Sequence, residues 1–404
     1  MFLSKALPPS VRDSYNRDAL SGVLGNIMAG FTGPFIALIA RDQLHTSATV
    51  LGLMMSAPFV GNLFAMFWAN AMEGKSKLPF VVYSTMAARG VFLLMPLAIT
   101  QTPFAILIII SSLLSTIAGP AYASVMMEIY PKRIRGRAMG YVRVCTASVV
   151  VLSVAAAGPL LNHVSYRIVF PLAALIGIAS SWVFKSVKTS EVESVEKAKL
   201  HEFLLNTVMI LKHDKPFRWF AMSIFTVGFG TLTVMPLYTI FQVDTLHIKT
   251  TELSWVANTS VVMAIASYFF WGRYVDKRSP LKGSAIGVLL VTLTPLTYAF
   301  LAHFPFARHW AVLLPAAAIS GVSGAALELS YFNSILGFSG PDRVSHYQAL
   351  FSSLLGIRGA IAPLIGTFLV EHGVVEMESL FLMAAVLCLV SVAMQVYGTR
   401  SHDG

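Results

Sequence analysis

The chain has 404 residues, of which 56% are hydrophobic and 12% charged, with a formal net charge of +10 and a mean hydropathy of +0.71. This balance excludes an ordinary soluble globular protein, in which about a quarter of the residues are charged. The positive charge does not indicate a nucleic-acid partner, because its placement along the chain follows a membrane topology.

Apolar runs of about 20 residues recur along the whole chain, and each is long enough to cross a bilayer as a helix. Lipid offers no hydrogen-bond partners to the backbone, so these runs must be helices unless they close into a barrel. They lack the period-two alternation of barrel strands. The twelve expected spans are 19–40, 48–72, 78–99, 103–128, 138–161, 167–186, 217–241, 252–274, 281–302, 309–338, 345–370 and 378–398.

The basic residues lie unevenly between the two sides of these spans. If the N-terminus is cytoplasmic, cytoplasmic tails and loops hold 22 of the 29 lysines and arginines, whereas outer loops hold only Arg41, Arg167, Lys249 and Arg308. This imbalance is the positive-inside pattern. We therefore expect a multi-pass protein of the cytoplasmic (inner or plasma) membrane with both termini in the cytoplasm. A polar, mixed-charge stretch precedes the first span, so no cleavable signal peptide is expected.

The two halves of the sequence resemble each other. The matching pairs are 42–45 with 244–247, 67–78 with 270–281, and 131–133 with 341–343. We expect an all-α membrane protein of two pseudo-symmetric six-helix bundles, one over 1–186 and one over 217–404. Duplicated membrane bundles are typical of transporters, whose halves rock around a site held between them.

A charged segment, 187–216, joins the two halves. Leu200, Phe203, Leu204, Val208 and Leu211 fall on one face of a helix. The pattern predicts an amphipathic helix on the cytoplasmic surface. The alternative is a solvated linker with chance periodicity.

Glycine and proline gather in the first and fourth helices of each half. They are Gly25, Gly30, Gly33, Pro34, Gly119, Pro120, Gly228, Gly230, Pro236, Gly321 and Gly324. Breaks in corresponding helices of two halves point to a binding site. The alternative is close helix packing through small residues.

The loop after the second span of each half carries a resemblance to a known family. Its features are a small residue, an acid four positions later and then basic residues, and they fall at Gly272, Asp276, Lys277 and Lys282, and in weaker form at Ala69, Glu73, Lys75 and Lys77. With twelve spans and a charged central loop, the chain resembles the major facilitator superfamily over nearly its whole length. The resemblance implies solute transport by alternating access. Gly158-Pro159 is similar to part of the superfamily's antiporter motif, although the usual following glycines are absent.

Charges at the cytoplasmic helix ends suggest a conformational latch. Carboxylates near basic residues and helix ends are stabilised by about 0.3–1 kcal/mol each when exposed. If such pairs form only when the cytoplasmic side closes, they favour the outward-open state. The predicted latch residues are Glu73, Lys75, Asp276, Lys277, Glu128, Arg135, Arg137 and Arg143. The alternative is that the basic residues only fix the topology.

Three charges lie deep in predicted spans. At 1.5 Å per residue, Glu328 lies about 15 Å and Arg358 about 20 Å from the cytoplasmic ends of their helices, which favours a buried pair. A charge at this depth costs at least about 2.5–3.5 kcal/mol, so it has a partner or a use. Glu328 is then either a proton carrier or part of a permanent structural pair. For Arg89, hydrogen bonding to carbonyls is favoured over binding an anionic substrate.

Polar residues that can face a substrate cavity are Asn26, Ser115, Thr226, Asn258, Ser323, Tyr331 and Asn333. Each can equally be satisfied within its own helix. No metal site is expected: Cys145 and Cys388 fall in different spans, and no histidine lies deep in one. Gly74-Lys75-Ser76 lacks the glycine and the strand of a phosphate-binding loop, and no catalytic motif is present.

We therefore predict a secondary active transporter that moves a small solute and is coupled to protons, with antiport favoured over facilitated uniport or symport of an organic anion. A transporter-like receptor or assembly scaffold is the alternative from another class, and a membrane enzyme ranks third. No cofactor is expected. The expected partners are a small-molecule substrate, the lipid bilayer and protons, with the chain acting as a monomer.

Overall fold

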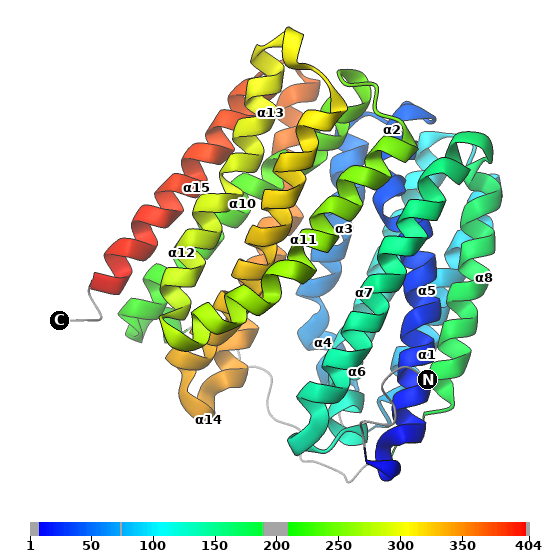
Figure 1. Ribbon diagram of the computed structural model, residues 1–404, viewed down its shortest axis with the longest axis vertical. Coiled ribbons are helices and arrows are strands. Elements are labelled where there is room, and N and C mark those ends of the chain that lie inside the picture. Colours follow the sequence, from blue (N-terminus) through cyan, green and yellow to red (C-terminus); the bar gives the residue numbers. More distant parts are fainter. Residues whose placement is uncertain (1–7, 73–74, 188, 190–208, 401–404) are drawn as a thin grey trace. The chain divides into compact units, whose positions relative to one another are not determined.

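The computed structural model describes residues 8–72, 75–187, 189 and 209–400, and all regular structure in these ranges is helical (Figure 1). The first half contains α1 (Pro9–Thr32), η2 (Gly33–Phe35), α2 (Ile36–Asp42), α3 (Ala48–Leu63), α4 (Ala65–Ala71), α5 (Leu78–Gly90), η3 (Val91–Leu97), α6 (Gln101–Ile129), α7 (Lys132–His163) and α8 (Tyr166–Lys185). The second half contains α10 (Lys215–Asp244), α11 (Thr250–Lys277), α12 (Pro280–Val291), α13 (Leu293–His303), η4 (Pro305–Ala307), η5 (Trp310–Val312), α14 (Leu313–Glu371) and α15 (Met377–Arg400).

Eleven helical segments in the described ranges are long and apolar enough to cross a membrane, and α3 is a shorter apolar helix. The prediction of an all-α membrane fold is confirmed. The predicted second span, 48–72, is not continuous, because a turn at Phe64 separates α3 from α4. These two helices pack on different neighbours, α3 on α14 and α4 on α6. The tenth and eleventh spans both fall within α14, as Trp310–Ser339 and His346–Glu371.

The chain divides into two compact units. Unit 1 comprises Met1–His45, Phe64–Lys197 and Lys249–Ser254, and unit 2 comprises Thr46–Leu63, Ala198–Ile248 and Trp255–Gly404. Each unit therefore includes a short segment from the other half of the sequence. The predicted linker helix lies outside the described residues except for Leu211, which packs against the unit 2 core around Phe217.

Unit 1 is built around α1, which packs on both α7 and α8 (Figure 1). Small residues allow α1 and α7 to approach closely: a Cβ at Gly30 would lie 2.5 Å from the Ser153 Cβ, and one at Gly22 would lie 2.9 Å from the Thr146 methyl. Close backbone approach through small residues is a common mode of helix association in membranes. These glycines therefore support the packing alternative.

Unit 2 has α10 packed against both α14 and α15. Its interior is rich in aromatic side chains, among them Tyr238 and Tyr298, whose ring centroids lie 4.2 Å apart. Phe217 and Tyr347 form an edge-on contact at 4.6 Å. The glycines of α6, α10 and α14 lie within continuous helices, and only the Gly33-Pro34 pair lies at a break, in η2. The predicted glycine breaks are thus mostly positions inside unbroken helices.

Candidate substrate and coupling site

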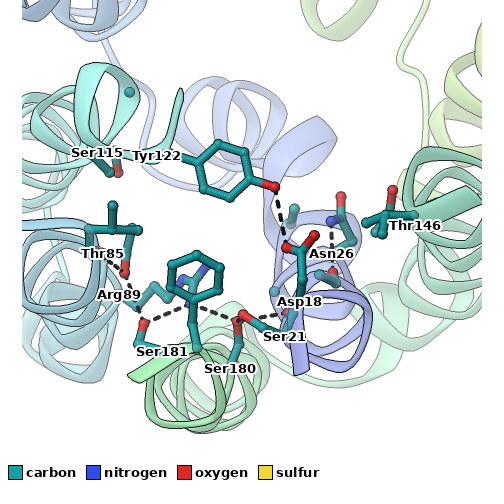
Figure 2. Close-up of a pocket in the computed structure, with 18 of the residues that line it drawn as sticks. Asp18, Ser21, Asn26, Thr85, Arg89, Ser115, Tyr122, Thr146, Ser180 and Ser181 are labelled. Atoms are coloured by element: carbon teal, nitrogen blue, oxygen red, sulfur yellow. Dashed lines mark hydrogen bonds between the residues drawn. The ribbon is translucent and has the colours of Figure 1, made fainter. Parts of the chain in front are cut away.

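A cavity of about 540 Å³ lies inside unit 1, between α1, α5, α6, α7 and α8 (Figure 2). Its size falls within the range of small-molecule sites, about 300–1,000 Å³. Its polar lining residues are Asp18, Ser21, Asn26, Thr85, Arg89, Ser115, Tyr122, Arg143, Thr146, Ser180 and Ser181. The cavity therefore holds a carboxylate and guanidinium groups amid several hydroxyls.

Asp18 lies in the interior of α1 and is only 3% exposed. Its carboxylate accepts hydrogen bonds from the hydroxyls of Tyr130, at 2.8 Å, and Tyr122, at 3.3 Å. No lysine or arginine in the described part of the chain forms an ion pair with it. A carboxylate in a membrane-spanning helix, held only by neutral donors, is costly to keep charged.

Sequence reasoning missed Asp18 because it started the first span at residue 19. The helix instead begins at Pro9, since proline is well suited to a first helical turn, where its missing N–H has no partner to lose. A signal was present: Val11, Tyr15 and Ala19 recur at helical spacing, and all three are buried. Extending the helix to Val11 places Asp18 beside this buried face.

Arg89 of α5 is held by α8. One guanidinium nitrogen, Nη1, donates to the Gly177 carbonyl at 2.6 Å and to the hydroxyls of Ser180 and Ser181 at 2.9 and 2.8 Å. Its other terminal nitrogen, Nη2, lies next to Gly25, where a Cβ would be 2.9 Å away. Figure 2 shows the arginine directed toward the two serines. This carbonyl contact agrees with the favoured sequence interpretation, and Arg89 also lines the cavity.

The predicted cavity residues do not all line the same cavity. Asn26 and Ser115 line the unit 1 cavity, although each also donates to a carbonyl of its own helix. Tyr331 lines a separate cavity of about 290 Å³ in unit 2. The others line neither of these cavities: Thr226, Ser323 and Asn333 donate to carbonyls of their own helices, and Asn258 is buried.

Glu328 and Arg358 do not form the expected buried pair. The Tyr268 hydroxyl of α11 donates to the Glu328 carboxylate, and the Glu328 side chain is exposed. Arg358 is 7% exposed and donates through Nη1 to the Ile224 carbonyl of α10. The depth of a residue along its helix does not determine which neighbouring helix its side chain faces. Arg358 turns toward α10, where Gly228 leaves room for the guanidinium, whereas Glu328 faces α11.

Of the predicted latch residues whose side chains the structure describes, four lie at or near helix ends, and Arg143 lies inside α7. Asp276 and Lys277 are exposed at the end of α11, and Lys75 is exposed before α5. Glu128 is exposed near the end of α6, and Arg143 is exposed on α7. Glu73 and the side chains of Arg135 and Arg137 lie outside the described residues. Within the described ranges, no group of three His, Cys, Asp or Glu residues could hold a metal ion.

Comparisons with known proteins identify the family. The sequence matches the family model described as Major Facilitator Superfamily over residues 19–244 and 220–403. No curated protein sequence matches the chain.

Solved structures with the same fold include the nucleoside transporter NupG, with a TM-score of 0.74 at 12% identity, covering 96% of this chain and 99% of that one. A bacterial homologue of the iron transporter ferroportin, in an inward-facing state, has a TM-score of 0.73 at 13% identity, with 95% and 98% covered. A bacterial homologue of the human lysosomal transporter Spinster has a TM-score of 0.68 at 15% identity, with 98% of each chain covered. At these identities the likeness shows the fold alone.

The family match extends over nearly the whole chain and agrees with its membrane-spanning helices. The protein is therefore an integral, multi-pass membrane protein that moves a solute, and it is not an enzyme. The chain belongs to the major facilitator superfamily of secondary transporters.

Proposed function

We propose that this transporter couples solute movement to protons, that Asp18 is the protonatable group, and that antiport is the mode of coupling. One observation carries the proposal: a buried carboxylate lines a cavity of solute size, and its hydrogen-bond partners among the described residues are tyrosine hydroxyls. This assigns to Asp18 the role that the sequence suggested for Glu328, which is exposed and bonded to Tyr268.

The chemistry of the carboxyl supports this role. A charge within the membrane costs at least about 2.5–3.5 kcal/mol on insertion scales, and protonation removes it. The charged form accepts hydrogen bonds from Tyr122 and Tyr130, whereas the protonated form also carries a donor of its own. The two forms therefore interact differently with the tyrosines, and a protein with two conformations responds to such a difference by shifting between them.

The position of Asp18 favours antiport. Because the carboxyl and the solute share one cavity, a solute that interacts with the charged carboxylate competes with the proton for the same place. Arg89 supports the second candidate, symport of an organic anion with a proton, because its Nη2 lies beside the cavity-lining Gly25 and can bind an anionic group. The direction of proton movement separates the two modes.

A test reconstitutes the full chain in liposomes that contain a pH-sensitive dye. Nucleosides, amino acids, sugars, organic anions, cationic drugs and divalent metals are added one at a time. Antiport predicts that uptake of the transported solute makes the lumen more alkaline, and symport that uptake acidifies it. Asp18→Asn is expected to abolish the solute-driven pH change and to retain uncoupled solute exchange.

The matched control is Glu328→Gln, which neutralises another carboxylate of a membrane-spanning segment. It should leave the pH change within about twofold of the wild type. Loss of coupling in Glu328→Gln together with normal coupling in Asp18→Asn would show that the assignment to Asp18 is wrong. A solute flux that does not move protons in the wild type would refute proton coupling itself.

A cytoplasmic latch is also part of the proposed mechanism. The exposure of Asp276 and Lys277 at the end of α11 supports this role. Removing the acid in Asp276→Asn should weaken the outward-open state. Cysteine accessibility labelling from each side of the membrane measures the two populations, and unchanged populations would rule out the latch.

A further inference from the structure

A second cavity, in unit 2, has buried polar atoms in its wall for which the described residues provide no hydrogen-bond partner. It has a volume of about 290 Å³ and is bounded by α10, α12, α13 and α14. Among the described residues, no hydrogen-bond partner exists for the Tyr331 hydroxyl, the Arg358 Nε or the Thr294 hydroxyl, and all three residues line this cavity. Buried polar groups are nearly always paired in folded proteins. Three such groups around one cavity indicate a site that receives a polar ligand group.

Arg358 is fixed at the wall of this cavity. It is 7% exposed, its Nη1 donates to the Ile224 carbonyl, and Gly228 provides the space for its guanidinium. Among the described residues, no aspartate or glutamate lines the cavity, and Glu328, the acid expected to pair with Arg358, is bonded to Tyr268 instead. The cavity wall therefore carries a positive charge without an acidic residue to compensate it. Such a site favours an anion.

The donors match a carboxylate. Arginine Nε–H can only donate, and the hydroxyls of Tyr331 and Thr294 can both donate. A carboxylate offers two oxygens with about four acceptor positions, which accommodates these donors together. Charge-assisted hydrogen bonds of this kind are roughly twice as strong as neutral ones.

The other lining residues indicate the polarity and size of the rest of the ligand. Most of it is apolar, including Val227, Leu232, Met235 and Leu327. The volume lies just below the usual range for ligand pockets, so the ligand is small. We propose that the unit 2 cavity binds a small amphipathic monocarboxylate, with its carboxylate on Arg358, Tyr331 and Thr294 and its apolar body against α10 and α14.

This inference goes beyond the proposed function, which places the solute and the proton in the unit 1 cavity. The test uses the full chain in lipid nanodiscs and equilibrium dialysis with radiolabelled benzoate, a carboxylate on an apolar ring. Benzyl alcohol and benzylamine serve as neutral and cationic competitors. Saturable benzoate binding is expected, and neither competitor should displace it at tenfold higher concentration.

Variants of residues inside and outside the cavity test whether benzoate binds at this site. Tyr331→Phe deletes one donor and should weaken benzoate binding about tenfold or more, as expected for a lost hydrogen bond to a charged group. Arg358→Gln should abolish the binding, and Tyr331→Phe covers the case in which Arg358→Gln does not fold. Tyr274→Phe, a matched change outside this cavity, should leave binding unchanged.

Three results would overturn the inference. One is the absence of saturable benzoate binding to the folded wild type, and another is wild-type affinity in Tyr331→Phe. The third is binding that survives in Arg358→Gln but is lost in Arg89→Gln, which would place the anion in the unit 1 cavity. None of these depends on proton flux, so failure of this site and failure of the proposed coupling are distinguishable.

Discussion

The cavities of the two units are built on related helices but have different chemistry. Asp18 of α1 corresponds by the internal repeat to Phe220 of α10, 202 positions later, as Pro34 corresponds to Pro236. In unit 1, Tyr122 donates to the Asp18 carboxylate at 3.3 Å. In unit 2, Tyr331 instead contacts the Phe220 ring, with centroids 6.0 Å apart. One tyrosine therefore has an acidic acceptor, and the other has an apolar neighbour.

This difference shows that the two halves of a duplicated bundle can acquire cavities with different binding chemistry. Unit 1 combines a carboxylate, an anchored arginine and many hydroxyls in about 540 Å³, whereas unit 2 has an arginine in a smaller, mainly apolar space of about 290 Å³. Helix packing is maintained in both halves. In the proposed mechanism, the replaced side chains decide which half exchanges a proton.

The largest expected effect comes from giving unit 2 the carboxyl of unit 1. Phe220→Asp removes a buried aromatic ring, which costs about 3–5 kcal/mol, and adds a charge without the partner that Tyr130 gives to Asp18. We expect the free energy of unfolding to fall by at least about 3 kcal/mol. Unfolding in mixed detergent micelles measures it.

The matched change in unit 1 is Asp18→Asn, which keeps the shape of the side chain and an acceptor for the tyrosines. Its cost should stay below about 1 kcal/mol, because it also removes a buried charge. Equal losses in the two variants would show that the two sites do not differ in their tolerance of a carboxyl.

The next effect concerns the tyrosines. Tyr130→Phe removes a 2.8 Å hydrogen bond to a carboxylate, and hydrogen bonds to charged groups contribute about 1.5–3 kcal/mol. Tyr331→Phe removes a hydroxyl that has no partner in the described structure, so the free energy of unfolding should change by less than about 0.5 kcal/mol or rise. Thermal unfolding of both variants without added ligand tests this contrast, and a larger loss in Tyr331→Phe would contradict it.

A smaller contrast concerns the glycines beside the two arginines. A Cβ at Gly228 would overlap the Arg358 guanidinium, which is buried, and overpacking of this kind costs about 1–3 kcal/mol. A Cβ at Gly25 would lie 2.9 Å from the terminal Nη2 of Arg89 and 3.1 Å from the Ser180 hydroxyl, a smaller overlap than the one at Gly228. Gly25→Ala should therefore destabilise less than Gly228→Ala in the same unfolding assay. The reverse order would mean that Arg89 is the more rigid of the two.

The last effect concerns how Arg89 is anchored. Ser180→Ala removes the hydroxyl that bonds Arg89 at 2.9 Å, but the Gly177 carbonyl and Ser181 remain as partners. The same hydroxyl also donates to the Ser21 carbonyl at 2.8 Å, so two hydrogen bonds are lost. The expected loss is about 2 kcal/mol, at a net contribution of about 1 kcal/mol for each hydrogen bond. Ser186→Ala, at an exposed position at the end of the same helix, is the control and should change stability by no more than about 0.5 kcal/mol.

The sequence by itself determined the class of protein. In lipid, runs of about 20 apolar residues can pair their backbone N–H and C=O groups only as helices. The repeated loop pattern indicated the superfamily. It also favoured a carbonyl partner for Arg89, and the structure has that arginine bonded to Gly177. The cytoplasmic termini and the monomeric state stay predictions.

The tertiary structure alone decided which charged groups meet. Glu328 and Arg358 lie at similar depths in adjacent spans but turn to different neighbours, Tyr268 and the Ile224 carbonyl. Asp18 of α1 accepts hydrogen bonds from Tyr122 and Tyr130, which are more than 100 positions away in the sequence. Hydropathy and depth are properties of one helix, whereas the direction of a side chain around its helix, and the partner it finds there, depend on how several helices pack.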